Sequence, residues 1–141
     1  MGKKRVIKKG GQDSARGAAT FRAPKKKIER GNLCIEATYN NTKLALTDSA
    51  GNTLLWSSSG SMGFSGSKKG TPFAASKVGE MLADRALSIG LKEVDVVIRG
   101  VGAGRESAMR AFSAKGINVM SIKDRTPVPF NGPKPPKPRR V

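Results

Sequence analysis

Residues 94–107 read VDVVIRGVGAGRES and join a strand-like run to a helical one. The β-branched residues that open this stretch favour an extended conformation, and an alanine-rich helical pattern follows it. Gly100, Gly102 and Gly104 allow a sharp turn and a close approach of the backbone to another group. The first amides of the following helix, together with Arg105, favour a bound anion such as phosphate. We therefore take this glycine turn as the first candidate site.

The chain before the glycine turn predicts three strands and a long helix. Apolar and polar residues alternate in three short segments separated by turn residues, which is typical of an antiparallel meander. Thr71 and Pro72 are typical of a helix start, and Gly90 of a helix end. The expected elements are strands at 33–39, 43–48, 53–58, 93–99 and 117–122, and helices at 71–89 and 106–115.

This element order predicts an α/β fold with one five-stranded mixed sheet. Strand–helix–strand connections make the last three strands parallel, with right-handed crossovers. If the fourth strand pairs with the first, the spatial order is 3-2-1-4-5. We expect a helix layer on each face of the sheet, which gives three α/β/α layers. Residues 31–126 form this domain, between basic extensions at 1–30 and 127–141.

The charge of the chain points to a polyanionic partner. Twenty-seven Lys and Arg residues face ten acidic ones, for a net charge of +17 in 141 residues. The net charge is +9 over residues 1–30, +4 over 31–126 and +4 over the proline-rich segment 127–141. Nucleic acid fits such a distribution, because cationic arms bind phosphates and release counterions. The two extensions are therefore expected to act as nucleic-acid-binding arms.

Composition argues against several other classes of protein. No apolar run approaches the roughly 20 residues of a membrane-spanning helix, and we expect no signal peptide because no apolar segment follows the basic N-terminus. The single cysteine, Cys34, excludes an internal disulfide and suits a reducing cytoplasm. Without histidine, a zinc site is not expected. The glycine spacing does not match the dinucleotide fingerprint, and no Walker sequence is present, so we expect no cofactor.

Two loops are candidates for contacts with RNA. The Ser- and Gly-rich segment 57–70 permits close approach to a phosphate backbone, carries Lys68 and Lys69, and offers Phe64 for stacking. Asn40 and Asn41 suit a two-residue hairpin turn and are candidates for a ribose or base contact. A flexible loop and simple turn chemistry are the alternatives for these two segments.

A nuclease is the main enzymatic alternative. Glu36, Asp48 and Asp95 lie on or beside expected strands, and clustered carboxylates hold metal ions in such enzymes. Each of them also fits an exposed position of a half-polar strand, and this second interpretation is favoured. We therefore expect a structural RNA-binding protein with no catalytic residues and no bound metal. A free-standing RNA chaperone is the remaining alternative.

Several short stretches recur together in one known family. They are Tyr39-Asn40-Asn41-Thr42, Thr47-Asp48-x-x-Gly51-Asn52, Gly63-Phe64-x-Gly66-Ser67-x-Lys69, Thr71-Pro72-Phe73-Ala74-Ala75, Gly104-Arg105-Glu106-Ser107, Thr126-Pro127-x-Pro129, Asn131-Gly132 and Arg139-Arg140-Val141. Over residues 31–141 the chain thus resembles the family of bacterial small-subunit ribosomal protein eleven. The family commonly has proline where this chain has Val101 and Ala103, and Arg where it has Ser65.

The resemblance implies a ribonuclease-H-like fold without nuclease activity, in the cytoplasm and within the ribosome. It also implies a place on the platform of the small subunit, where the family bridges rRNA helices and helps form the cleft for the Shine–Dalgarno duplex at the mRNA exit. The implied neighbours are small-subunit proteins seven, eighteen and twenty-one, with initiation factor three nearby. The residues expected to contact RNA are Lys3, Lys4, Arg5, Lys8, Lys9, Lys25, Lys26, Lys27, Asn40, Asn41, Ser67, Lys68, Lys69, Gly102, Gly104, Arg105, Arg125, Asn131, Lys134, Lys137, Arg139 and Arg140.

Overall fold

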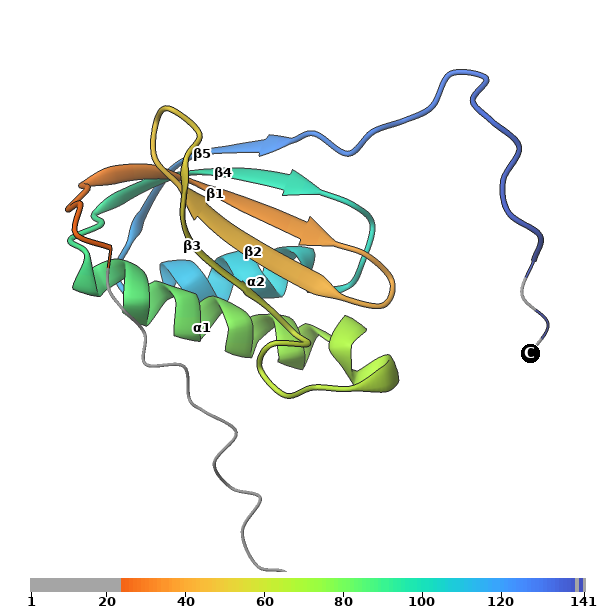
Figure 1. Cartoon of the computed structure of the whole chain (residues 1–141), viewed down its shortest axis with the longest axis horizontal. Helices are drawn as coiled ribbons and strands as arrows, with labels where there is room; N and C mark the ends of the chain where they lie inside the picture. The colour runs from red at the N-terminus through yellow and green to blue at the C-terminus, as the bar shows by residue number, and fades with distance from the viewer. Residues whose placement is uncertain (1–23, 139, 141) are drawn as a thin grey trace, which may run out of the picture.

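A single mixed sheet with two α-helices organises the chain (Figure 1). The structure, a computed structural model, describes residues 24–138 and Arg140. No helix among these described residues is long and apolar enough to cross a membrane. The elements are β1 (Arg30–Ala37), β2 (Thr42–Thr47), β3 (Thr53–Ser58), the short 3-10 helix η1 (Gly66–Gly70), α1 (Pro72–Ser88), β4 (Glu93–Arg99), α2 (Gly104–Ser113) and β5 (Asn118–Asp124).

The strand order is β3-β2-β1-β4-β5, which confirms the predicted five-stranded mixed sheet. β1 is antiparallel to β2 and parallel to β4, and β5 is parallel to β4. Leu33 on β1 lies in register between Leu46 on β2 and Val96 on β4, and all three side chains are fully buried. The alternating pattern of the sequence therefore places one face of each strand in the core.

The arrangement of the helices corrects the expectation of three layers. α1 and α2 pack against one another on the same face of the sheet, where Phe112 and Leu82 are fully buried (Figure 1). The reason is the direction of the crossovers. From β3 to β4 and from β4 to β5 the chain moves the same way across the sheet, and two right-handed crossovers in one direction put both helices on one side. The described part of the chain is thus a two-layer α/β structure.

The ends of α1 agree with the sequence prediction. The Thr71 hydroxyl accepts a hydrogen bond from the Ala74 amide, Pro72 is the first helical residue, and Gly90 follows the helix with φ of 89°. Residues before β1 also join the fold, since Ile28 packs against the core and its amide bonds to the Ile89 carbonyl. The folded region therefore begins before residue 31, where the basic arm was expected to end.

Candidate nucleic-acid interface

One end of the sheet, here called the loop end, gathers most of the predicted contact segments. β1, β4 and β5 end there, and so does β3, because β3 is antiparallel to β2 and parallel to these three strands. The loop end consists of the β1–β2 turn at 38–41, the segment 59–71, the glycine turn at 100–103 and Thr126. Both α-helices also begin there. Segments that are distant in sequence therefore form one surface.

The glycines at this end serve internal packing. A Cβ at Gly100 would lie 2.1 Å from the Ala37 carbonyl oxygen, and one at Gly104 would lie 2.3 Å from Thr42 Oγ1. Gly102 is buried, and its amide donates to the Ala37 carbonyl at 2.9 Å. This differs from the expected cradle for phosphate. Gly102 and Gly104 let the glycine turn lie against the β1–β2 hairpin, and the RNA contacts proposed below belong to exposed side chains instead.

Arg105 is held by partners within the chain. Its guanidinium donates to the Gly100 carbonyl and to the Asp124 carboxylate, and it lies 3.4 Å from the Thr126 hydroxyl. The Thr126 hydroxyl donates to Asp124, which also accepts the Thr126 amide. These bonds hold the pKa of the Asp124 carboxyl well below its usual range, through Thr126 first and Arg105 next. Arg105 thus ties the glycine turn to the point where the C-terminal tail begins.

The β1–β2 turn is closed one residue earlier than expected. The Thr38 amide donates to the Asn41 carbonyl at 2.8 Å, so Tyr39 and Asn40 occupy the tip. Both tip residues are exposed, and Tyr39 is not part of the buried alternation of β1. Asn41 is half-buried, and its side-chain oxygen is buried without a hydrogen-bond partner among the described residues. Of the two candidate asparagines, Asn40 is therefore better placed to contact RNA.

The segment 59–71 packs against that turn. Gly70 lies so close to it that a Cβ would sit 2.2 Å from the Tyr39 carbonyl oxygen. Ser67 and Lys68 on η1 are exposed, whereas Lys69 is half-buried. Phe64 does not stand free for stacking, because it packs edge-on against Phe73 with ring centres 6.0 Å apart. The exposed groups of this loop are accordingly Ser67 and the Lys68 ammonium.

The C-terminal tail extends away from the sheet after Thr126 (Figure 1). Every described residue from Pro127 onward is exposed, including Lys134, Lys137 and Arg140. Asn131 has a φ of 52°, which bends the tail next to Gly132. Nothing in the described fold neutralises these tail cations, so their charges are available to a partner.

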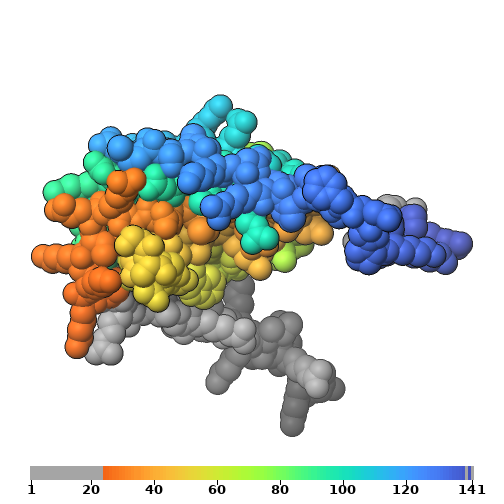
Figure 2. Space-filling model, turned by 90° about the horizontal axis from the view of Figure 1, so that it is seen from above, coloured from red at the N-terminus to blue at the C-terminus, as the bar shows by residue number. Residues whose placement is uncertain are grey.

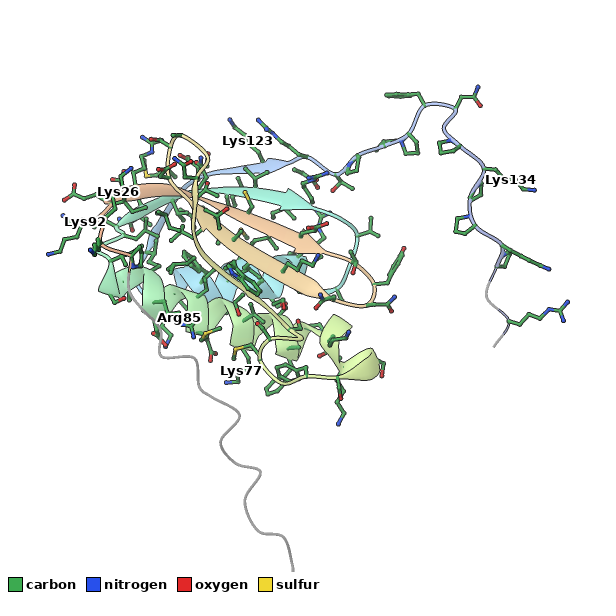
Figure 3. All side chains as sticks on the ribbon, viewed as in Figure 1. Lys26, Lys77, Arg85, Lys92, Lys123 and Lys134 are labelled. Carbon is green, nitrogen blue, oxygen red and sulfur yellow. The ribbon has the colours of Figure 1, made fainter. Side chains whose placement is uncertain are left out.

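The cations before β1 lie at the opposite end of the sheet from the loop end. Lys25, Lys26 and Lys27 are exposed, and Lys26 pairs with Asp48 at 3.2 Å beside the end of β2. The predicted contact residues therefore occupy two ends of the domain, and Figure 3 shows Lys26 at the end away from the C-terminal tail. Six of them lie outside the described residues: Lys3, Lys4, Arg5, Lys8, Lys9 and Arg139.

The carboxylates considered for a nuclease are dispersed. Asp48 accepts the Ala50 and Asn52 amides, and Asp95 accepts the Ser121 hydroxyl and Arg30. The Asn52 bonds lower the pKa of Asp48 to about 2, and the Ser121 bond is the main cause of a lowered pKa at Asp95. In the part of the chain that the structure describes, no group of three His, Cys, Asp or Glu side chains could hold a metal ion. These acids stabilise turns and strand contacts.

Sequence reasoning missed a second set of cations on the sheet itself. Lys43, Arg99 and Lys123 lie on the face opposite the helices, together with the predicted Arg125. Strand alternation alone could have found Lys43 and Arg99, because each occupies the parity opposite to the buried residues of its strand. It could not have found Lys123, which has the same parity as the core-packed Val119 and reaches this face because the β4–β5 register shifts after Val94. These cations are accessible only because both helices lie on the other face of the sheet. The expectation of three layers placed a helix over each face, and so it left no exposed sheet face on which to look for them.

Comparison with protein families identifies the chain. The family model of Ribosomal protein S11 matches residues 31–140, which include the sheet except its first residue, both helices and the C-terminal tail. Members of this family are structural, rRNA-binding proteins of the small ribosomal subunit and are not enzymes. A free-standing RNA chaperone and a nuclease are thereby set aside. This chain belongs to the Ribosomal protein S11 family.

Proposed function

We propose that the chain bridges separate rRNA helices on the platform of the small subunit and helps form the cleft for the Shine–Dalgarno duplex at the mRNA exit. One observation supports this best: the exposed cations lie in places too far apart for one site. Lys68 is on η1 at the loop end. Figure 3 shows Lys26 at the opposite end and Lys134 on the projecting tail. Groups placed in this way can bind phosphates of more than one RNA segment at once.

The tail and the loop end have different roles in this proposal. The loop end offers Asn40, Ser67 and Lys68 around turns that pack closely against one another, and so it fixes the orientation of the domain. The tail carries four cations and no acids in residues 127–141 and supplies a large share of the affinity. The basic residues before β1, including those outside the described residues, form a third contact region.

Binding to rRNA at varied salt tests the bridging. The tail variant replaces Lys134, Lys137, Arg139 and Arg140 by Gln in the full chain, and the loop variant carries Lys68→Gln and Lys69→Gln. Each variant should lower the affinity for rRNA. It should also reduce the slope of log affinity against log salt concentration, by up to about one unit for each phosphate that is no longer bound. Footprints on the rRNA should lose protection at different segments in the two variants. Loss at one shared segment would contradict bridging.

Tethered cleavage tests the location. A single thiol is obtained by Cys34→Ser with Lys137→Cys, because the chain has one cysteine. An iron chelate on that thiol, in reconstituted small subunits, should cleave rRNA around the mRNA exit. The same chelate at Lys92→Cys, which lies at the other end of the sheet, gives the matched control. Cross-links to small-subunit proteins seven, eighteen and twenty-one, and to initiation factor three when bound, are expected. Cleavage only at distant rRNA would contradict the platform position.

A further inference from the structure

No described helix covers the sheet face opposite α1 and α2, which is here called the open face (Figure 1). A hollow of about 990 Å³ indents it between β2 and β5, and a second of about 350 Å³ lies around Trp56 on β3. Cys34 on β1 lines both hollows. The two hollows share Cys34, together reach all five strands, and are here called the trough. Its floor is made of small side chains such as Cys34 and Ala45, which permit close approach of a ligand.

The walls of this trough carry an excess of positive charge. Five cationic and two acidic side chains line the two hollows. Arg99, Lys123 and Arg125 gather where β4 and β5 end, and none of them forms a salt bridge with a described carboxylate. Lys123 points away from the helices (Figure 3), and in the view from above the blue residues of the β5 region lie along one side of the domain (Figure 2). Asp95 is already paired with Arg30.

The other end of the trough offers an aromatic surface. Trp56 is 65% exposed and pairs in register with Ala45, whose small side chain leaves the indole uncovered on that side. Lys43 is on the same face, beside the Trp56 hollow. Glu36 lines this hollow as well, opposite Lys43 in register, so the other cations of the site are those at the ends of β4 and β5. An exposed aromatic ring with cations along the same face is the combination with which proteins stack bases and hold phosphates of single strands. Four strand spacings of about 4.8 Å each separate β3 from β5, a span that a flexible strand can cross.

We propose that the open face binds a single-stranded RNA segment, with one base stacked on Trp56 and phosphates on Arg99, Lys123 and Arg125. The site lies on the open face rather than on the loop-end turns that carry Asn40, Ser67 and Lys68, although its three cations are where β4 and β5 reach that end, and it rests on the proposed rRNA binding. An unpaired segment is required because the bases of a duplex are stacked on one another and do not offer a free face to the indole. The excess of cations favours RNA over a basic protein as the occupant.

Trp56 is the single tryptophan of the chain, so its fluorescence reports directly on this site. A short unstructured oligouridylate added to the full-length protein should quench the emission, with an affinity that falls as salt rises. The triple variant Arg99→Gln, Lys123→Gln, Arg125→Gln should weaken this binding by about tenfold or more. The matched control, Lys77→Gln, Arg110→Gln, Lys115→Gln, removes the same charge from the helical side of the domain and should bind and quench as the parent chain does.

A second pair of variants separates stacking from charge. With labelled RNA, Trp56→Ala should weaken binding more than Trp56→Phe, because Phe keeps a ring face for the base. A photo-reactive amino acid in place of Trp56 should cross-link to rRNA in assembled small subunits. Circular dichroism of each variant checks that the fold is retained.

Three results would overturn the inference. RNA binding without a change in Trp56 emission, and with the triple variant equal to the parent chain, would show that the open face is not used while rRNA binding itself stands. Cross-links from position 56 to protein alone would show that another protein covers the face. A chain that binds no RNA at all would overturn the proposed function as well.

Discussion

The Arg105 guanidinium and the Asp124 carboxylate join the start of α2 to the end of β5. Arg105 also donates to the Gly100 carbonyl, and Asp124 also accepts two bonds from Thr126. The Arg105 side chain is 28% exposed and that of Asp124 is 50% exposed. The pair therefore sits at the surface and fixes the direction in which the C-terminal tail leaves the domain.

We expect Asp124→Asn to loosen the first residue of the tail. The change keeps an oxygen acceptor and removes the charge that Arg105 meets, so exchange of the Thr126 amide with solvent should quicken. Affinity for rRNA should fall because the tail is no longer held in one direction. The control is Glu106→Gln, which breaks the exposed Glu106–Arg110 pair on α2 and should change little. Equal effects of the two variants on the exchange of the Thr126 amide would contradict the proposal that the Arg105–Asp124 pair holds the start of the tail.

Asp48 should make folding stability depend on acid pH. Its pKa is lowered from 3.8 to about 2 by bonds from Asn52 and then Lys26, so the folded state favours the charged carboxylate. Its contribution is complete above the unfolded-state pKa and is lost as the pH falls from about 4 toward 2. Asp48→Asn should thus be less stable than the parent at pH 6, and the difference should shrink below pH 4.

Unfolding by denaturant at several pH values measures this difference, and carbon NMR of the carboxyl follows the titration directly. Asn52→Ala removes one donor to Asp48 and should raise its pKa part of the way. A carboxyl that titrates near 3.8 in the parent chain would contradict the assignment.

Gly104→Ala should destabilise the domain by about 1–3 kcal/mol through overpacking. A new Cβ would lie 2.3 Å from Thr42 Oγ1 and 2.8 Å from the Ala75 side chain, and both neighbours are buried. Gly60→Ala is the control, since its Cβ would meet Lys69 only at an ordinary 3.7 Å. Thermal unfolding of the two variants compares them. An unchanged midpoint for Gly104→Ala would mean that the glycine turn does not pack as closely as the structure shows.

Features of the fold that depend on local pattern were predictable from the sequence. Alternation located the strands, and Thr71, Pro72 and Gly90 marked the ends of α1 because capping depends on a few neighbouring residues. The rule on crossovers made the last three strands parallel, and the strand order followed on the condition that the fourth strand pairs with the first. The same rule also gives the side of the sheet on which each helix lies, once the direction of both crossovers is taken into account, and this step corrects the three-layer expectation.

The partners of individual side chains were not predictable in this way. Arg105 looked free to meet a phosphate because its partner, Asp124, is 19 residues away at the end of β5. The three glycines looked suited to a ligand because the hairpin against which they pack is distant in sequence. Arg99 and Lys123 were overlooked because their importance depends on an uncovered sheet face. In each case the missing information was the tertiary register of β1, β4 and β5.

Gly79→Ala tests the placement of both helices on one face. In an exposed helix this change would stabilise the protein by up to about 1 kcal/mol, because alanine has the higher helix propensity. Here a Cβ on α1 would lie 2.6 Å from the Ala108 carbonyl oxygen of α2 and 3.2 Å from the Ala111 side chain. We therefore expect destabilisation, measured as a lower unfolding midpoint. Ser76→Ala, at a half-buried position of the same helix, is the control for propensity and should not lower the midpoint. A gain in stability at Gly79 would place the two helices apart, as a three-layer fold requires.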